Sequence, residues 1–141
     1  MDTLIKPHCS IPGEVVKIHG IPDAMVADAR GYSDIHNQLM DIFMEKSVII
    51  YNASFDLRLI RQSGPDLDFT NIEASRSIIC AMEWYAEFHG QWDNIRNSFK
   101  WQKLVNAARQ QNIDVSDLRA HRALADCIIT QRVITTVNGK I

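Results

Sequence analysis

The chain of 141 residues carries 15 basic and 17 acidic side chains, and its net charge of −2 argues against a protein that holds long duplex nucleic acid by bulk electrostatics. Its 46% hydrophobic content predicts a single globular domain, residues 1–141, with a buried core. The scattered cysteines argue against a zinc site or a disulfide framework and favour the cytoplasm, and no apolar run approaches the roughly 20 residues of a membrane span, so no membrane partner is expected.

The first third of the chain alternates extended and helical patterns. Thr3–Lys6 is predicted to be the end of a strand. A short helix is expected over residues 13–18, and Gly20 would end it in a turn. Asp34–Met44 repeats apolar residues at helical spacing, with Ser33 as the expected N-cap.

The middle of the chain contains the clearest strand pattern. Val48–Tyr51 is a continuous apolar run, which is typical of a strand covered on both faces. A helix is expected from Phe55 to Ile60, and Ser77–Cys80 gives a weaker strand prediction. Glu83–Phe88 is predicted to be helical, and Gly90–Asn97 is predicted to be a polar loop.

The last third of the chain is predicted to be mainly helical. Trp101–Ala108 carries an apolar helical face, which places its tryptophan in the core. The final helix is expected over Ala123–Val137, with Leu124, Ile128 and the pair Val133–Ile134 turned inward. Trp92, in the polar loop, is the tryptophan best placed to stack on a base. Strands that alternate with helices predict an α/β domain.

Two carboxylates stand where elements begin. Asp56 follows the apolar strand and could hold a hard cation at the rim of a sheet, or it could cap the helix that follows. Asp126 lies in an apolar helical stretch, where a charge is costly unless it is paired or metal-bound. It could also be a solvent-facing residue favoured by the helix dipole. Taken singly, each position leaves both interpretations open.

His121 precedes Asp126 by five residues. On one continuous helix the two side chains would lie roughly 140° apart. They can therefore serve one site only if His121 lies on the loop before the helix, where it could accept a proton from water. The alternative is a surface histidine.

Two further positions could contact a substrate. Asn52 could hydrogen-bond a ligand at the strand exit, or it could be a turn residue that tolerates a left-handed backbone. The segment His19–Ile21 offers a polar group, a close backbone approach and an apolar surface. His-Gly pairs also end many helices, so this segment alone is a weak signal.

In combination these segments resemble the DEDDh class of 3′-to-5′ exonucleases, the family of the proofreading subunit of bacterial replicative polymerases, ribonuclease T and exodeoxyribonuclease X. The family's Asn-Ala-x-Phe-Asp motif is similar to Asn52–Asp56. Its His-Arg-Ala-Leu-x-Asp-(Ala/Cys) motif is similar to His121–Cys127, and its His-Gly-Ile turn to His19–Ile21. The order and rough spacing agree from Thr3 to Val137.

The resemblance implies a ribonuclease H-like α/β fold, a mixed sheet flanked by helices, and two-metal hydrolysis of phosphodiester bonds in DNA or RNA. It implies that Asp56 and Asp126 bind Mg²⁺ or Mn²⁺ and that His121 takes the proton from the attacking water. The residues implied to hold the terminal nucleotide of a single-stranded 3′ end are His19, Gly20, Ile21 and Asn52.

One motif of the family has no counterpart in this chain. The family's Asp-x-Glu lies on a strand before a Lys-Pro strand, and here the sequence begins at the segment containing Lys6 and Pro7. We therefore expect an N-terminally truncated fold that lacks its first two strands. We also expect poor hydrolysis or none, because two carboxylates are few oxygen ligands for a metal pair.

The missing strands would leave an unpaired edge beside Val48–Tyr51. We expect a second chain, as in a homodimer, a rearranged Thr3–Lys6 segment, or residues lost to a misplaced start codon to cover it. Two other functions compete with a nuclease: a non-catalytic remnant that binds nucleic acid, and a structural partner in a polymerase or repair complex.

Overall fold

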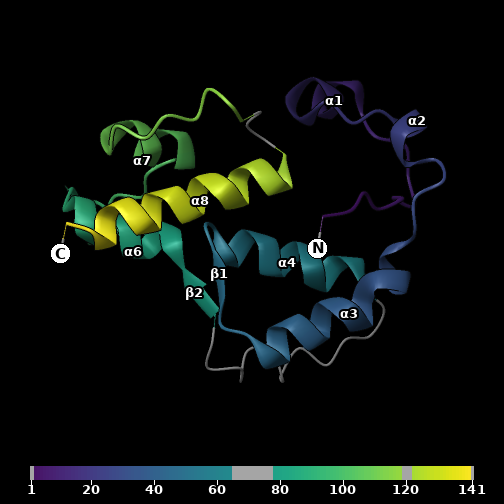
Figure 1. Cartoon of the computed structure of the whole chain (residues 1–141), viewed down its shortest axis with the longest axis horizontal. Coiled ribbons are helices and arrows are strands. Elements are labelled where there is room, and N and C mark those ends of the chain that lie inside the picture. Colours follow the sequence, from purple (N-terminus) through teal and green to yellow (C-terminus); the bar gives the residue numbers. More distant parts are fainter. Residues whose placement is uncertain (1, 65–77, 119–121, 141) are drawn as a thin grey trace. The chain divides into compact units, whose positions relative to one another are not determined.

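The computed structural model describes residues 2–64, 78–118 and 122–140. The chain divides into two compact units, Met1–Ser47 with Arg58–Ser77 and Val48–Leu57 with Ile78–Ile141 (Figure 1). Each unit has buried residues of its own. The expectation of a single domain over residues 1–141 stays a prediction.

The first unit begins with two short helices. Helix α1 (Gly13–His19) ends at Gly20, whose φ of +70° is the left-handed conformation that glycine adopts without strain. The N–H of Gly20 donates to the carbonyl of Val16 at 2.7 Å, so the predicted helix and its turn are confirmed. Helix α2 (Asp23–Val26) follows directly.

Helix α3 (Tyr32–Glu45) is the long helix of this unit and confirms the predicted periodic segment. Its cap differs from the expectation, because Gly31 rather than Ser33 is the N-cap. The Asp34 carboxylate accepts the N–H of Gly31 at 2.9 Å and so satisfies a donor at the helix start. Residues along the helix supply much of this unit's core: Tyr32, Ile35 and Phe43.

The prediction of a strand at Thr3–Lys6 was wrong. Within the described ranges the segment pairs with no strand, and the N–H of Lys6 donates to the carbonyl of Arg30 at 2.9 Å. A short β-branched run has the composition of a strand, but a strand also needs a neighbouring chain segment to pair with.

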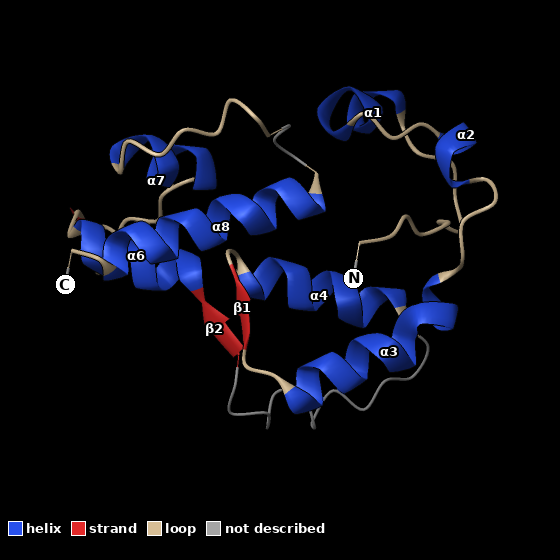
Figure 2. Ribbon diagram, viewed as in Figure 1, coloured by secondary structure: helices blue, strands red, loops and turns tan. Residues whose placement is uncertain are grey.

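The second unit contains the two strands that the apolar runs predicted. Strand β1 (Val48–Ile50) pairs in parallel with β2 (Ile78–Cys80), and Ile49 lies opposite Ile79 (Figure 2). These two central residues remain 46% and 47% exposed. The expectation that β1 is covered on both faces was therefore wrong, because alternate residues of the pair face a side that is only half covered.

Helix α4 (Ala53–Ser63) follows β1, and its residues belong partly to each unit. Helix α6 (Ala81–His89) follows β2, and α7 (Leu104–Gln110) packs against α8 (Ala123–Asn138). The core of the second unit is built from these last three helices. Its fully buried members are Tyr85, Ala107, Ala108, Ile129, Val133 and Val137.

The prediction for the buried face of α8 is confirmed at Val133, but nearer the helix start the buried residues lie one position after the predicted Leu124 and Ile128. Buried positions recur at Ala125, Ile129, Val133 and Val137, every fourth residue, whereas Leu124 is 50% exposed. A shift of one residue turns a helix by about 100°. Because α8 is apolar on several sides, its composition favoured no single face.

A β-hairpin occupies the segment that was predicted to be a polar loop. Strand β3 (Trp92–Asp93) pairs antiparallel with β4 (Ser98–Phe99), so that Trp92 lies opposite Phe99. The Asp93 carboxylate closes the turn by accepting the N–H of Ile95 at 2.9 Å and that of Arg96 at 3.2 Å.

Trp101 does not lie in the core as predicted, because α7 begins only at Leu104 and the tryptophan is 52% exposed. In the ranges that the structure describes, the strands are these two pairs, and the proposed loss of the fold's first two strands stays a prediction. No helix in those ranges is long and apolar enough to cross a bilayer.

The position of α8 can be tested with a matched pair of truncations. Ile129→Ala should cost about 2–5 kcal/mol of unfolding free energy, because it leaves a cavity in the core. Leu124→Ala should cost about 1 kcal/mol or less, because that side chain is already half in solvent. Denaturant midpoints at equal m-values measure both, and a larger cost at Leu124 than at Ile129 would contradict the observed face.

Candidate active site

The turn after β1 places one of the two predicted carboxylates. The carbonyl of Asn52 accepts the N–H of Phe55 at 3.1 Å and that of Asp56 at 3.2 Å. These are the first bonds of α4, so the helix starts directly at the strand end. Asp56 therefore lies in the first turn of α4, half-buried beside the end of β1.

Tyr51 anchors this turn to the rest of the second unit. Its carbonyl accepts the N–H of Met82 at 2.8 Å, and its hydroxyl donates to the carbonyl of Gln102 at 2.9 Å. Burial raises the pKa of the phenol well above its usual 10, and the neighbouring Tyr85 and Cys80 raise it further. Tyr51 therefore remains a neutral hydrogen-bond donor at any physiological pH.

The second carboxylate lies in the first turn of α8. Asp126 follows the buried Ala125 and is itself half-buried, and its N–H donates to the carbonyl of Arg122 at 2.9 Å. Because Ala125 belongs to the buried face of α8, the adjacent position is held at the border of the core.

The two carboxylates act on each other within the second unit. Burial raises the pKa of Asp56 above its usual 3.8, and the negative charge of Asp126 raises it further. A neighbouring like charge disfavours ionisation, so this shift marks two acidic groups that share a local environment. The structure thus brings together two residues that lie on different helices and far apart in the sequence.

The other predicted site residues are placed as follows. Asn52 is half-buried at the strand exit, and its side-chain oxygen accepts a hydrogen bond from the Ser54 hydroxyl at 3.3 Å. His19 lies in the first unit, where its Nδ1 accepts the N–H of Ile21 at 3.0 Å and closes the turn around Gly20. His121 lies outside the described residues.

The carboxylate pair suits a hard divalent cation. Carboxylate oxygens are the ligands that Mg²⁺ and Mn²⁺ prefer, and a cation would relieve the repulsion that raises the pKa of Asp56. Within the described ranges, no three His, Cys, Asp or Glu side chains gather as a metal-binding group. The described part of the site thus provides two acidic ligands.

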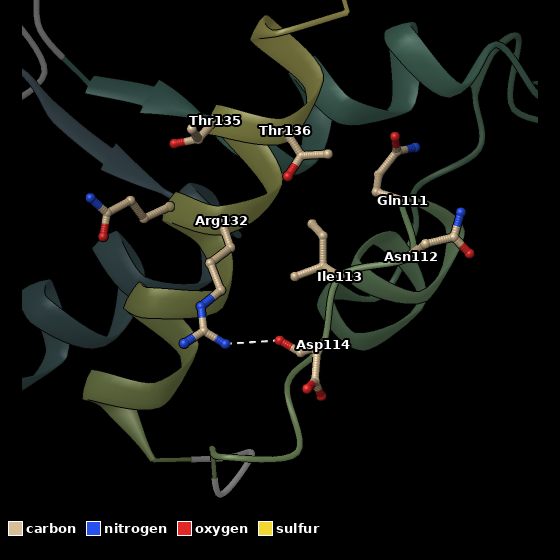
Figure 3. Close-up of a pocket in the computed structure, with 8 residues that line it drawn as sticks. Gln111, Asn112, Ile113, Asp114, Arg132, Thr135 and Thr136 are labelled. Carbon is tan, nitrogen blue, oxygen red and sulfur yellow. Dashed lines mark hydrogen bonds between the residues drawn. The ribbon is translucent and has the colours of Figure 1, made fainter.

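A pocket on the second unit is separate from these carboxylates. It has a volume of about 450 Å³ and lies between α8 and the segment after α7 (Figure 3). Arg132 at its edge donates to the Asp114 carbonyl at 2.8 Å and forms paired 2.8 Å bonds with the Asp117 carboxylate. The pocket is lined by Gln111, Asn112, Ile113, Asp114, Gln131, Arg132, Thr135 and Thr136.

Neither Asp56 nor Asp126 lines this pocket. On an ideal helix Arg132 lies about 9 Å further along the axis than Asp126 and about 120° around it. Arg132 is paired with the Asp117 carboxylate, and this hydrogen bond lowers the pKa of Asp117. Asp56 and Asp126 therefore define the candidate active site, and the pocket beside Arg132 is not part of it.

Comparison with known proteins places this arrangement in a family. A family model described as an exonuclease, RNase_T, matches residues 1–134. The chain belongs to the RNase T exonuclease family. This membership confirms the resemblance predicted from the two motifs and the His-Gly-Ile turn, and it supports an exonuclease, RNase H-like fold.

Relatives in the RNase T family agree with this assignment. The chain is 41% identical over 138 residues to the uncharacterized exonuclease CP81 of Escherichia phage 186, an alignment that covers 95% of this chain and 70% of the phage protein. It is 28% identical over 136 residues to the DNA polymerase III subunit epsilon of Pasteurella multocida, covering 96% of this chain and 51% of that subunit. It therefore spans about half the length of that subunit.

A solved structure of the same family type is also similar. Exonuclease X, in complex with 5′ overhanging duplex DNA, matches with a TM-score of 0.65 and 25% sequence identity. The match covers 97% of this chain and 71% of the exonuclease X chain. The similarity thus extends along almost the entire sequence.

Removing one of the two repelling charges should stabilise the metal-free protein. Asp56→Asn is expected to raise the Tm in chelator at neutral pH by on the order of 1–3 °C, because solvent screening holds the gain from a half-exposed pair below about 1 kcal/mol. Asp41→Asn, at an exposed carboxylate of α3, is the matched control and should leave the Tm unchanged. A lower Tm for Asp56→Asn would contradict the repulsion.

The same repulsion predicts a pH dependence. Because the pKa of Asp56 is raised in the folded state, the folded protein holds this proton more tightly than the unfolded chain does. Its contribution favours folding below the usual value of 3.8 and is lost as the pH rises through the raised pKa. The difference in Tm between Asp56→Asn and the unaltered protein should therefore grow from acidic to neutral pH in chelator, as thermal melts can show.

Proposed function

We propose that this chain is a 3′-to-5′ exonuclease domain that hydrolyses phosphodiester bonds of DNA or RNA with divalent metal ions. The observation that carries the proposal is the electrostatic coupling between the half-buried Asp56 and Asp126. Two acidic side chains that repel each other at the border of a core are costly unless a cation joins them. Membership of the RNase T exonuclease family supports the same reaction.

Each proposed site residue has a role that its chemistry can perform. Asp56 and Asp126 would hold Mg²⁺ or Mn²⁺, which when bound would stabilise the negative charge of the reacting phosphate. His121 would accept the proton of the attacking water, because imidazole titrates near neutral pH. The residues proposed to hold the terminal nucleotide are His19, Gly20, Ile21 and Asn52.

We further propose that hydrolysis by this chain of 141 residues is slow. The described part of the site provides two carboxylates, whereas a metal pair about 3.5–4 Å apart is usually held by more oxygen ligands. A bound phosphate or a partner chain could complete the coordination. We propose in addition that the chain acts as a homodimer or as part of a polymerase or repair complex.

DNA is the first substrate to test. Exonuclease X was solved with 5′ overhanging duplex DNA, and the epsilon relatives are subunits of a DNA polymerase. The proposed ligand is a single-stranded 3′ end, as the family resemblance implies. We also propose a cytoplasmic location, which agrees with three free cysteines, Cys9, Cys80 and Cys127.

A labelled oligonucleotide tests the reaction and its direction. With Mn²⁺ or Mg²⁺, a single-stranded DNA labelled at its 5′ end should shorten stepwise from the 3′ end, and chelator should stop the reaction. Asp56→Asn and Asp126→Asn should abolish this activity, and His121→Ala should reduce it by roughly 10²–10⁴-fold. Asp41→Asn should degrade the DNA at the unaltered rate.

The outcomes separate the proposed enzyme from its rivals. Stepwise products that persist in both Asp variants would sink the assignment of the metal ligands. A turnover near the 1–10³ s⁻¹ typical of enzymes would refute the proposed impairment. Metal-independent nucleotide binding without any cleavage would identify a non-catalytic binding protein instead.

A further inference from the structure

The hairpin β3–β4 and the residues after it carry an exposed aromatic surface that the proposed reaction does not use. We propose that this surface binds single-stranded nucleic acid by stacking bases on Trp92 and Trp101. We call it the hairpin surface and define it by Trp92, Arg96, Lys100, Trp101 and Lys103. The inference rests on the proposed function only for the class of partner.

The backbone register places the two tryptophans on one side of the hairpin. Trp92 lies opposite Phe99, and the ladder continues with the N–H of Lys100 donating to the carbonyl of Gln91 at 2.7 Å. Side chains alternate between faces along an extended chain, so Phe99 and Trp101 share a side. Trp101 follows Phe99 by two residues, so this alternation puts it on the side of the hairpin that carries Trp92.

Both tryptophans keep half of their surface in solvent although neighbours hold them in place. Trp92 is 49% exposed and packs edge-on against Phe99, with ring centroids 5.2 Å apart. Trp101 is 52% exposed, and the guanidinium carbon of Arg96 lies 6.0 Å from its ring centroid. An ordered aromatic ring with an open side can stack on a base at little further entropic cost.

The charge of this segment is opposite to that of the chain. Residues 91–103 contain one carboxylate, Asp93, and three cations, Arg96, Lys100 and Lys103, a local charge of +2 against −2 for the whole protein. The Oδ1 of this carboxylate accepts two N–H groups of the hairpin turn, and its Oδ2 lies 3.9 Å from the Nε of Arg96 in an ion pair. Phosphates would thus meet a local excess of cations here, in a chain whose net charge is negative.

The segment that follows the hairpin is joined to the candidate active site by a hydrogen bond from a side chain. The carbonyl of Gln102, the residue after Trp101, accepts the Tyr51 hydroxyl at 2.9 Å. Tyr51 directly precedes Asn52 and the turn that positions Asp56. A nucleic-acid strand bound to the hairpin would therefore be held next to a segment that is hydrogen-bonded to the end of β1.

Flat rings with adjacent cations favour nucleic acid over a protein partner. A protein partner would be expected to bury the most exposed apolar residue nearby, Ile95, which is 96% exposed at the hairpin tip. Base stacking has no use for this aliphatic side chain, since it needs a π-face. Ile95 is thus the matched control for the two tryptophans.

Fluorescence anisotropy of the full chain in chelator tests the proposal without the metal site. The probes are labelled oligo(dT) and oligo(rU) of about 12 nucleotides, within the ~4–16 that single-strand-binding surfaces cover. Trp92→Leu and Trp101→Leu should each weaken binding roughly 5- to 150-fold, whereas Trp92→Phe and Trp101→Phe should stay close to the unaltered protein. Ile95→Ala should bind unchanged, and Arg96→Gln should reduce the salt slope by about 0.7.

Two further arms separate the sources of binding. An abasic oligonucleotide should bind much more weakly than oligo(dT), because it keeps the phosphates and lacks the bases. The relative affinities for dT and rU identify DNA or RNA as the natural ligand, and either result supports stacking. Circular dichroism and the Tm of each variant verify that the hairpin substitutions leave the fold intact.

The proposal is overturned if the unaltered protein does not bind either oligonucleotide in chelator. Unchanged binding by both Leu variants, or equal losses for Ile95→Ala and Trp92→Leu, would also overturn it. Asp41→Asn, at an exposed carboxylate of α3, should bind oligo(dT) as the unaltered protein does. Binding without metal-dependent cleavage would refute the proposed reaction but not the hairpin surface. Cleavage with binding that does not depend on the tryptophans would refute the hairpin surface but not the reaction.

Discussion

The candidate site depends on the burial of the Asp56 carboxylate near the negative charge of Asp126, which together raise the pKa of Asp56. Asp56 is carried by the first turn of α4, and Asp126 by the first turn of α8. Neither helix is free to move its aspartate away, because Tyr51 ties the strand exit to α6 and to Gln102, while α8 is buried along Ile129, Val133 and Val137. The fold thus holds Asp56 where ionisation of its carboxyl is disfavoured, as functional sites often do.

The same elements that impose this contact also provide the proposed means of holding a substrate. Gln102 is buried, and its amide group donates to the Lys100 carbonyl at 3.0 Å and accepts from Gln110 at 3.0 Å. These bonds fix the segment between the hairpin and α7. The neighbouring Trp101 side chain is therefore attached to an ordered backbone. Rigid support is what allows exposed side chains to bind a flexible strand without a large loss of entropy.

Much of the fold could be predicted because its signals are local. Gly20 ends α1 through a left-handed backbone that few other residues adopt, and the apolar runs at Val48–Tyr51 and Ser77–Cys80 contain the paired strands. The failures concern tertiary contacts. Thr3–Lys6 has strand composition without a partner strand, and Trp101 has core spacing but precedes the helix that would have turned it inward.

The candidate site shows the same division. The resemblance to known motifs identified Asp56 and Asp126, whereas no periodicity in the chain could show that α4 and α8 bring the two charges together. The hairpin was missed because its strands have two residues each, too few for an alternating pattern. The roles of Asp56, Asp126, His121, Asn52 and the His19–Ile21 turn all remain predictions.

The half-open face of the β1–β2 pair has a consequence for handling the protein. Ile49 and Ile79 lie opposite each other, each nearly half in solvent, although parallel strands are usually shielded from water on both sides. Kosmotropic salts such as sulfate strengthen apolar association, so they should promote clustering of copies through this face. A higher concentration of such a salt would then have opposite effects on two surfaces. It would strengthen association through Ile49 and Ile79 and weaken the binding of a polyanion to the cations of the hairpin surface.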